Sequence, residues 1–160
     1  MFRIQVRPLD GTDADWMRQL LVEHWRSVKI VSRGKIHYAD RLPGFIALRS
    51  GERVGFATYR IESDECEIVT LNSIVEGIGV GSALIKAVRS KALSSNCHRV
   101  WLITTNDNLP ALRFYQRRGF TLAALYSNAL ERSRQLKPEI SLVGLDGIPL
   151  RDELELEMPL

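Results

Sequence analysis

Three glycines at alternate positions, Gly77, Gly79 and Gly81, are the feature that most constrains how this chain can fold. They follow an apolar run over residues 68–71 that predicts a buried strand, and a helical pattern begins at Val80. Glycines in a strand-to-helix turn let a ligand approach the backbone closely. The first N–H groups of the helix have no helical partner, and the helix dipole adds partial positive charge there. The turn therefore predicts an anion site, most naturally for phosphates.

The periodicity of apolar residues predicts a mixed α/β (α+β) chain. The expected strands cover residues 2–7, 45–48, 54–61, 65–71, 99–105, 120–126 and 153–158. The expected helices cover residues 13–27, 80–94, 109–118 and 127–136, and residues 28–42 are expected to be loop with at most a short helix or strand. Thr12 followed by Asp15 predicts a capping box for the first helix. The alternation of the last strand predicts that it is half-solvated.

The element order predicts a mixed, mostly antiparallel central sheet flanked by helices, with a three-stranded meander before the glycine turn. It excludes a doubly wound dinucleotide fold, in which strands and helices alternate from the start. The phosphate loop of ATPases is also excluded, because Ser82 follows Gly81 without the required lysine.

Composition predicts one domain spanning residues 1–160. The net charge of +3 is small and the basic residues are dispersed, so we expect no nucleic-acid partner in spite of a pI near 9.1. No apolar stretch approaches the ~20 residues of a membrane span, so we expect no membrane partner, and the first residues lack the layout of a signal peptide. The lack of a membrane span and of a signal peptide, together with the two free cysteines Cys66 and Cys97, predicts a cytoplasmic protein. Neither cysteine has neighbours at metal-ligand spacing, so we expect no metal site.

The glycine turn at residues 76–81 and a second motif at residues 108–120 together resemble those of the GCN5-related N-acetyltransferase (GNAT) family. The family's acetyl-CoA turn, Gln/Arg-x-x-Gly-x-Gly/Ala, corresponds here to residues 76–81, with Glu76 in place of the usual Gln or Arg. The second motif, Asn-x-x-Ala-x-x-x-Tyr-x-x-x-Gly-Phe, is met by Asn108, Ala111, Tyr115, Gly119 and Phe120. The resemblance implies a GNAT-type acyl-CoA N-acyltransferase fold and acetyl-CoA as acetyl donor. A carboxylate at Glu76 is tolerable if it points outward, because backbone N–H groups chiefly hold the pyrophosphate in this family.

The resemblance also implies which residues contact the donor. The implied acetyl-CoA contacts are Leu71, Asn72, Ser73, Glu76, Gly77, Ile78, Gly79, Val80, Gly81, Ser82, Asn108, Ala111 and Tyr115. Backbone groups of the first three are expected to meet the pantetheine arm, and Asn108 is also a plain candidate for a helix N-cap.

Acetyl transfer to an amine needs a base, because an alkyl amine has a pKa of about 10.4 and attacks only when neutral. The resemblance makes Glu67 the candidate base and Tyr115 the acid that protonates the departing thiolate. Glu65, on the same strand face, is an alternative base. Both glutamates could instead be solvated strand-end residues, and Tyr115 could be a core aromatic.

The resulting hypothesis is an N-acetyltransferase for a primary amine of a small molecule or peptide. The first helix and the segment after it usually shape the amine pocket in this family, which makes His24, Arg33, His37, Tyr38 and Asp40 candidate substrate contacts. Trp16, Trp25 and Cys66 are expected in the core. Alternatives are a catalytically silent acyl-CoA-binding module and, from the pI alone, a nucleic-acid-associated protein. The alternating last strand could support a homodimer.

Overall fold

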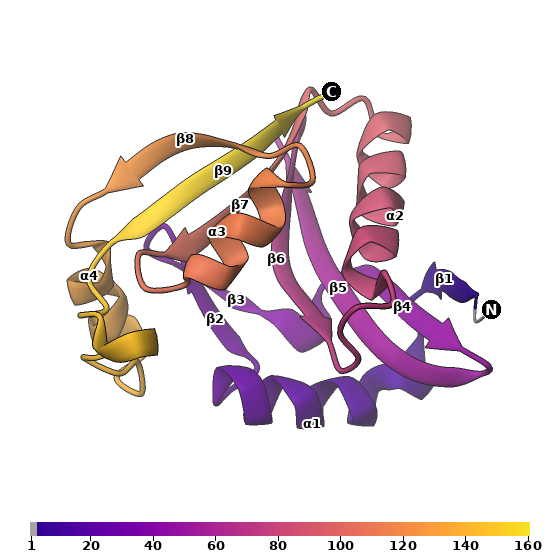
Figure 1. Ribbon diagram of the computed structural model, residues 1–160, viewed down its shortest axis with the longest axis horizontal. Coiled ribbons are helices and arrows are strands. Elements are labelled where there is room, and N and C mark those ends of the chain that lie inside the picture. The colour runs from indigo at the N-terminus through magenta and orange to yellow at the C-terminus, as the bar shows by residue number, and fades with distance from the viewer. Residues whose placement is uncertain (1–2) are drawn as a thin grey trace.

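A seven-stranded sheet organises the protein, and a computed structural model describes residues 3–160 (Figure 1). The strand order is β1-β4-β5-β6-β7-β9-β8, and within residues 3–160 only the β6–β7 pair of this sheet is parallel. The strands are β1 (Ile4–Pro8), β4 (Gly44–Arg49), β5 (Glu52–Glu62), β6 (Glu65–Ser73), β7 (Arg99–Thr105), β8 (Thr121–Tyr126) and β9 (Glu153–Pro159). This confirms the predicted mixed, mostly antiparallel sheet; Phe2 of the first predicted strand lies outside the described residues.

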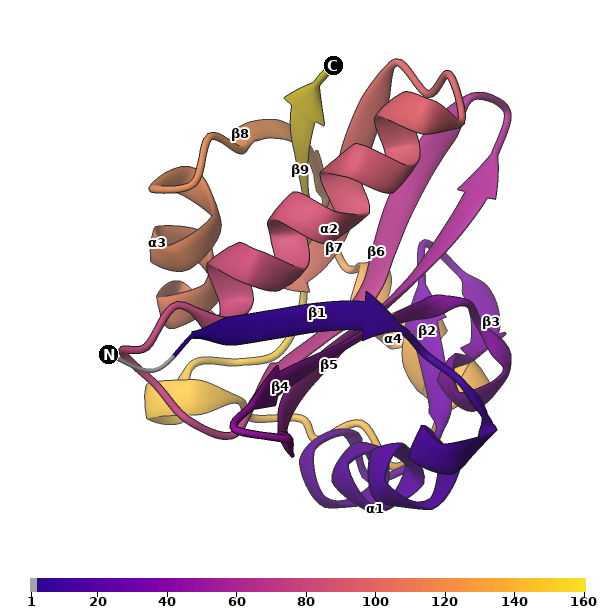
Figure 2. The same ribbon diagram turned by 90° about the vertical axis from the view of Figure 1, so that its right-hand side faces the viewer.

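Helices cover both faces of the sheet. The helices are α1 (Ala14–Trp25), α2 (Val80–Ser94), α3 (Leu109–Gln116) and α4 (Ala129–Leu136), with short 3₁₀ helices η1 (Gly11–Asp13), η2 (Ala39–Arg41) and η3 (Leu145–Gly147). Helices α2 and α3 pack on one face, and α1 lies on the other (Figures 1 and 2). One core cluster joins α2 to the sheet through Leu84 and Val88, and a second joins α1 through Leu21 and Phe56.

The first helix begins differently from the prediction. The capping box is formed by Asp10 and Asp13, which start η1, and not by Thr12 and Asp15. The carboxylate of Asp13 is buried and accepts hydrogen bonds from Arg7 and Arg53, so it is fixed by tertiary contacts as well as by the local cap.

Residues 28–42, expected to be mainly loop, contain a β-hairpin. Strand β2 (Lys29–Ser32) pairs with β3 (Lys35–Tyr38), and the two residues between them, Arg33 and Gly34, have φ values of 50° and 72°. Positive φ at both central residues is the signature of the two-residue turn that suits the twist of a hairpin. The hairpin forms a separate two-stranded sheet and carries Ser32 into the interior.

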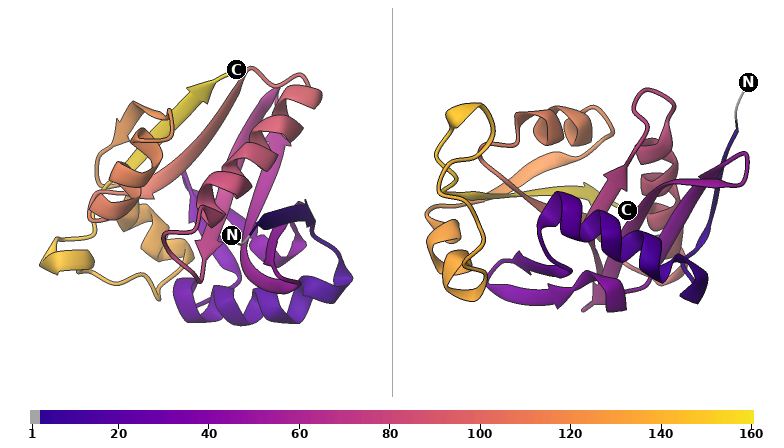
Figure 3. Two further views of the ribbon diagram at one scale, coloured as in Figure 1. Left: turned by 45° about the vertical axis from the view of Figure 1, so that its right-hand side comes forward. Right: turned by 90° about the horizontal axis from the view of Figure 1, so that it is seen from below.

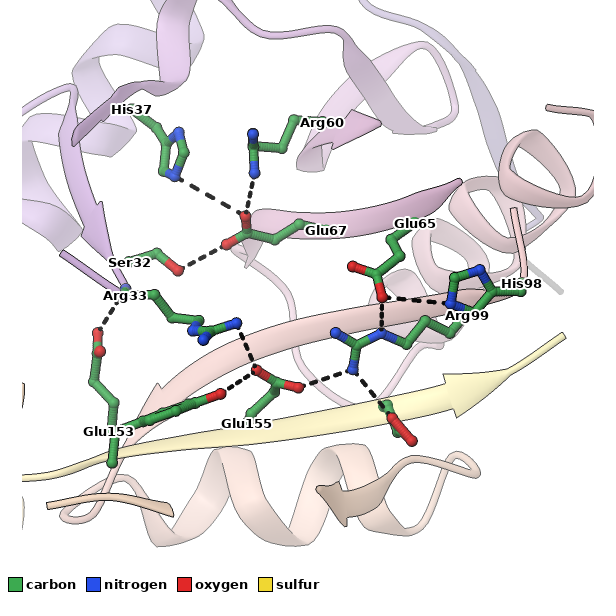
Figure 4. A network of polar contacts seen from close by, with 12 residues as sticks. Ser32, Arg33, His37, Arg60, Glu65, Glu67, His98, Arg99, Glu153 and Glu155 are labelled. Carbon is green, nitrogen blue, oxygen red and sulfur yellow. Dashed lines mark hydrogen bonds and ion pairs between the residues drawn. The ribbon is translucent and has the colours of Figure 1, made fainter. Parts of the chain in front are cut away.

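The last strand was predicted to be half-solvated, and this prediction is wrong. Strand β9 lies between β7 and β8, so it has a neighbour on each side, and Glu153 and Glu155 are buried. Figure 4 shows Glu155 among Arg33 and Arg99, whose guanidinium nitrogens lie 3.5 and 2.8 Å from its carboxylate oxygens. The buried charge is therefore matched by cations, which lowers the cost of removing it from water.

The parallel strands β6 and β7 pair over only part of their length. The register joins Glu65 through Ile68 to Arg99 through Leu102, and the strands then diverge, as Figure 3 shows in its left view. Backbone groups beyond this point have no partner across the gap and are available to a ligand. The gap positions the candidate site.

Candidate active site

The glycine turn opens onto a groove of about 560 Å³, here named the glycine-turn groove. It is lined by Leu71, Ser73, Val75, Glu76, Gly77, Gly79, Val80, Gly81, Pro110, Ala111, Phe114, Tyr115 and Arg118. The end of β6, the start of α2 and the helix α3 form its walls. Nine of the residues predicted to contact the donor lie in this one groove, which is large enough for an extended ligand.

The three glycines have two different structural roles. Gly77 and Gly79 have φ values of 79° and 86°, a left-handed conformation that favours glycine, and no atom lies within 4 Å of the position of an added Cβ. At Gly81 an added Cβ would lie 2.5 Å from Cζ of Phe114. The first two glycines thus shape the turn and leave space beside it, whereas the third lets α2 and α3 approach.

Arg118 places a cation in the groove that the sequence motifs did not predict. Its Nε donates to Oγ of Ser82 at 2.9 Å, and its guanidinium carbon lies 3.6 Å from the centre of the Phe114 ring. A fixed guanidinium beside a helix N-terminus favours phosphate groups. Glu76 also lines the groove and is exposed, which agrees with the expectation that its carboxylate can point outward.

Four predicted donor contacts do not line the groove. Asn72 accepts from Nε1 of Trp25 at 2.9 Å, and Ile78 packs against the core beneath the turn. Ser82 lies behind Arg118, to which it is hydrogen-bonded. Asn108 caps α3 by accepting from the N–H of Ala111 at 3.2 Å, and it lines a neighbouring cavity.

Tyr115 lies at the groove wall and also packs in the core. Its ring makes edge contacts with Phe114 and Phe120, at centroid distances of 5.1 and 5.4 Å. Burial raises the pKa of Tyr115, so its phenol carries a proton at neutral pH. Both functions considered for this residue are therefore compatible with its position.

Glu67 is a buried carboxyl on β6, only 2% exposed. Oγ of Ser32 donates to its Oε2 at 2.8 Å, Nη1 of Arg60 donates to its Oε1 at 3.3 Å, and Nε2 of His37 lies 4.0 Å from Oε1 (Figure 4). Burial raises the pKa of Glu67, and the contacts with Ser32 and Arg60 oppose that rise. A raised pKa makes a carboxylate a stronger base near neutral pH.

Glu65 has a different environment, although it shares the strand face with Glu67. Arg99 donates to its Oε1 at 2.8 Å, and Nε2 of His98 lies 3.4 Å from the same oxygen. The hydrogen bond from Arg99 lowers the pKa of Glu65. A carboxylate held by a guanidinium is a weak base. Of the two glutamates, Glu67 is therefore the one better suited to base catalysis.

Two cavities meet at Glu67. The hairpin cavity, about 310 Å³, is lined by Ser32, Arg33, Lys35, His37, Arg60, Glu62, Ser63, Glu65, Glu67 and Trp101. The strand-gap cavity, about 190 Å³, is lined by Trp25, Ile30, Val31, Ser32, Glu67, Ile68, Val69, Ile103, Thr104, Thr105, Asn108, Leu130, Lys137, Ile140, Leu150 and Glu153. The second lies where β6 and β7 separate, on the strand whose end also lines the glycine-turn groove.

Two of the five candidate substrate contacts line a cavity at Glu67, and three do not. Arg33 and His37 line the hairpin cavity. The other three line neither cavity: His24 and Tyr38 are exposed, and Asp40 pairs with Arg18. Of the expected core residues, Cys66 is fully buried, whereas Trp16 and Trp25 pack against the second core cluster as partly buried side chains.

Comparison with known proteins assigns the family. Residues 11–120 match the model of the acetyltransferase (GNAT) family. The chain belongs to this family. The match confirms the family suggested by the two motifs, the N-acetyltransferase function and acetyl-CoA as cosubstrate.

Two uncharacterized proteins of Bacillus subtilis strain 168 are similar in sequence. YdhI is 43% identical over 139 residues, covering 86% of this chain and 87% of its own, and YxbD is 41% identical over 154 residues, covering 96% and 97%. Among solved structures, a Bacillus subtilis acetyltransferase in complex with CoA aligns with a TM-score of 0.69 at 19% identity, covering 100% of this chain and 99% of its own. A GNAT acetyltransferase from Elizabethkingia anophelis with acetyl-CoA bound aligns at 0.70 and 19%, covering 98% of each chain. The likeness to these two solved structures confirms the predicted fold.

The described residues contain neither a candidate metal cluster nor a candidate membrane-spanning helix. Within residues 3–160, no group of three or more His, Cys, Asp or Glu side chains is arranged to hold a metal ion. No helix in the same range is long and apolar enough to span a membrane.

Proposed function

We propose that this acetyltransferase acts on the primary amine of a small molecule, which enters beside Glu67, while the acetyl donor lies in the glycine-turn groove. The observation that carries the proposal is the position of Glu67. Its buried carboxyl lines both cavities, and its strand continues to Leu71 and Ser73 in the donor groove. The limited volume of the strand-gap cavity, about 190 Å³, favours a small acceptor.

In the proposed mechanism Glu67 accepts a proton from the acceptor ammonium, directly or through a water molecule. The free electron pair of the nitrogen attacks the acetyl carbonyl carbon, a C–N bond forms and the C–S bond breaks. Tyr115 gives its proton to the departing thiolate and is reprotonated from solvent. The nitrogen loses two protons in all, of which one is balanced by the new thiol and the other passes to solvent. Acid–base catalysis of this kind contributes typically ~10²–10⁴-fold.

Thiol release from acetyl-CoA, measured with a broad panel of amines across pH, tests the proposal. The wild-type rate should rise with pH as Glu67 loses its proton, above the ordinary range for a glutamate because burial raises its pKa. Glu67→Gln should lower kcat/KM by about 10²- to 10⁴-fold and abolish that rise. A wild-type pH profile in Glu67→Gln would remove Glu67 as the base.

Glu65→Gln is the matched comparison, because it makes the same change two residues away on the same strand face. It should retain the pH-dependent rise, since Arg99 already holds the carboxylate of Glu65 in its ionised form. The assay also separates an enzyme from a silent binding module. Coenzyme A binding without amine-dependent thiol release from any member of the panel would support the binding module and refute the proposed activity.

A further inference from the structure

Lys137 is a buried cation in the strand-gap cavity that the acetyl-transfer steps do not use. It ends α4, is 6% exposed, and its Nζ donates to the backbone oxygen of Trp25 at 2.8 Å. No carboxylate forms an ion pair with it among residues 3–160. An ammonium group has three donors, so one neutral acceptor leaves most of its capacity unused.

The surroundings do not compensate for the burial of this charge. Burial lowers the pKa of Lys137; the exposed Glu139 raises it, and Lys29 and Arg26 lower it further. Removing an ammonium group from water is costly unless a counter-charge accompanies it. An anionic group bound in the cavity would supply that counter-charge.

The same cavity also carries carboxyl groups and apolar walls. Glu67 and Glu153 both line it, and Glu153, 2% exposed, accepts one hydrogen bond, from the backbone N–H of Arg33 at 3.4 Å. The apolar lining comprises Trp25, Ile30, Val31, Ile68, Val69, Ile103, Leu130, Ile140 and Leu150. A ligand that satisfies all three features carries a cation, an anion and an apolar body.

We propose that the acceptor is a small amino carboxylate, such as a free amino acid with an apolar side chain, whose carboxylate is bound by Lys137 and whose amine faces Glu67. This inference rests on the proposed function and specifies its substrate class. The apolar walls receive the side chain, and Glu153 adds a second carboxyl that favours the ammonium form on entry. A peptide or an amide of the same amino acid lacks the adjacent carboxylate and loses the contact with Lys137.

Matched pairs of acceptors test the inference. Thiol release is measured with L-leucine and L-leucinamide, and with L-phenylalanine and L-phenylalaninamide, at a pH where each amine is ionised to the same degree. The wild type should prefer at least one amino acid over its amide by about 10- to 100-fold in kcat/KM, the range expected for a hydrogen bond to a charged group. Lys137→Met should reduce that ratio to near one by losing activity on the acid and not on the amide.

Controls separate recognition from support of the fold. Lys91→Met, at an exposed position of α2, should keep the wild-type ratio. Lys137→Gln retains a donor for Trp25 without the charge, and it should also lose the preference while keeping the wild-type KM for acetyl-CoA. Equal losses on acid and amide in both Lys137 variants would show a purely structural role and overturn the inference.

The outcomes for the two proposals are distinct. A wild type that acetylates amides or simple amines as well as amino acids overturns the inference and leaves the proposed function intact. A wild type that acetylates no amine refutes the proposed function itself.

Discussion

Gly81→Ala tests whether the third glycine of the turn exists for helix packing and not for phosphate binding. An added Cβ would lie 2.5 and 2.9 Å from Cζ and Cε1 of Phe114. Carbon atoms in contact prefer separations of about 3.5–4.0 Å, so the ring must retreat by about 1 Å. Because Phe114 packs under Arg118 and against Tyr115, the displacement passes directly to the donor groove.

Two effects of the substitution oppose each other in stability. Overpacking costs about 1–3 kcal/mol, and the half-buried ring can move, so we expect the lower end of that range. Replacing glycine by alanine within a helix contributes about 0.5–1 kcal/mol in the opposite direction. The net change in the free energy of unfolding is therefore expected to be close to zero, and stability of the single variant does not decide the question.

A double-mutant cycle with Phe114→Leu does decide it. Leucine lacks the ring atoms that the added methyl group would meet, so Gly81→Ala should stabilise the Phe114→Leu protein by about 0.5–1 kcal/mol. Urea unfolding of the four proteins should then give a coupling energy of about 0.5–1 kcal/mol, the difference between the two backgrounds and within the range seen for residues in contact. In the otherwise wild-type protein, Gly81→Ala should raise the KM for acetyl-CoA several-fold.

Gly77→Ala is the control for this cycle. It introduces the same methyl group where nothing lies within 4 Å, but at a φ of 79°, which costs an alanine about 1–2 kcal/mol. That cost should be the same with phenylalanine or with leucine at position 114. A Gly81–Phe114 coupling below about 0.5 kcal/mol, or an equal coupling for Gly77, would refute the packing explanation.

Two further predictions concern the donor side of the site. Tyr115→Phe should lower kcat with little change in coenzyme A affinity, because the ring contacts remain and only the proton donor is lost; unchanged turnover would exclude Tyr115 as the acid. Arg118→Ala should weaken coenzyme A binding about tenfold by titration calorimetry, and less at high salt, because its guanidinium lies in the groove. Arg117→Ala, at the exposed neighbouring position, is the control, and an equal loss there would indicate general charge attraction.

The parts of the fold that the sequence predicted well are those with strong local signals. The glycine turn lies between β6 and α2 as expected, and β7 has the predicted bounds. Residues 28–42 lacked such a signal, because the Arg33-Gly34 turn requires positive φ at an arginine, which composition does not reveal. The hairpin is stabilised by tertiary packing, through Ile30 in the second core cluster.

The candidate site was likewise predictable only where its residues stand in local sequence motifs. Glu67 and Tyr115 could be named because they stand in or beside motifs. Ser32, Arg60 and Lys137 could not, since each comes from a separate element and reaches the site only through the three-dimensional fold. Burial of a polar side chain is a property of the assembled protein, and it is burial that makes Glu67 and Lys137 chemically unusual.

The last strand shows why a correct pattern can predict the wrong environment. Strict alternation in β9 correctly predicts that glutamates and apolar residues occupy opposite faces, but it does not say which face meets solvent. The hairpin of β2 and β3, which the sequence did not predict, contributes Arg33 to the glutamate face, where its guanidinium pairs with Glu155 and its backbone N–H with Glu153. Departures of this kind from a sequence pattern are expected at functional or strained sites. Here Glu153 lines the strand-gap cavity beside the proposed base, so the error in predicting β9 coincides with the region in which we place the acceptor.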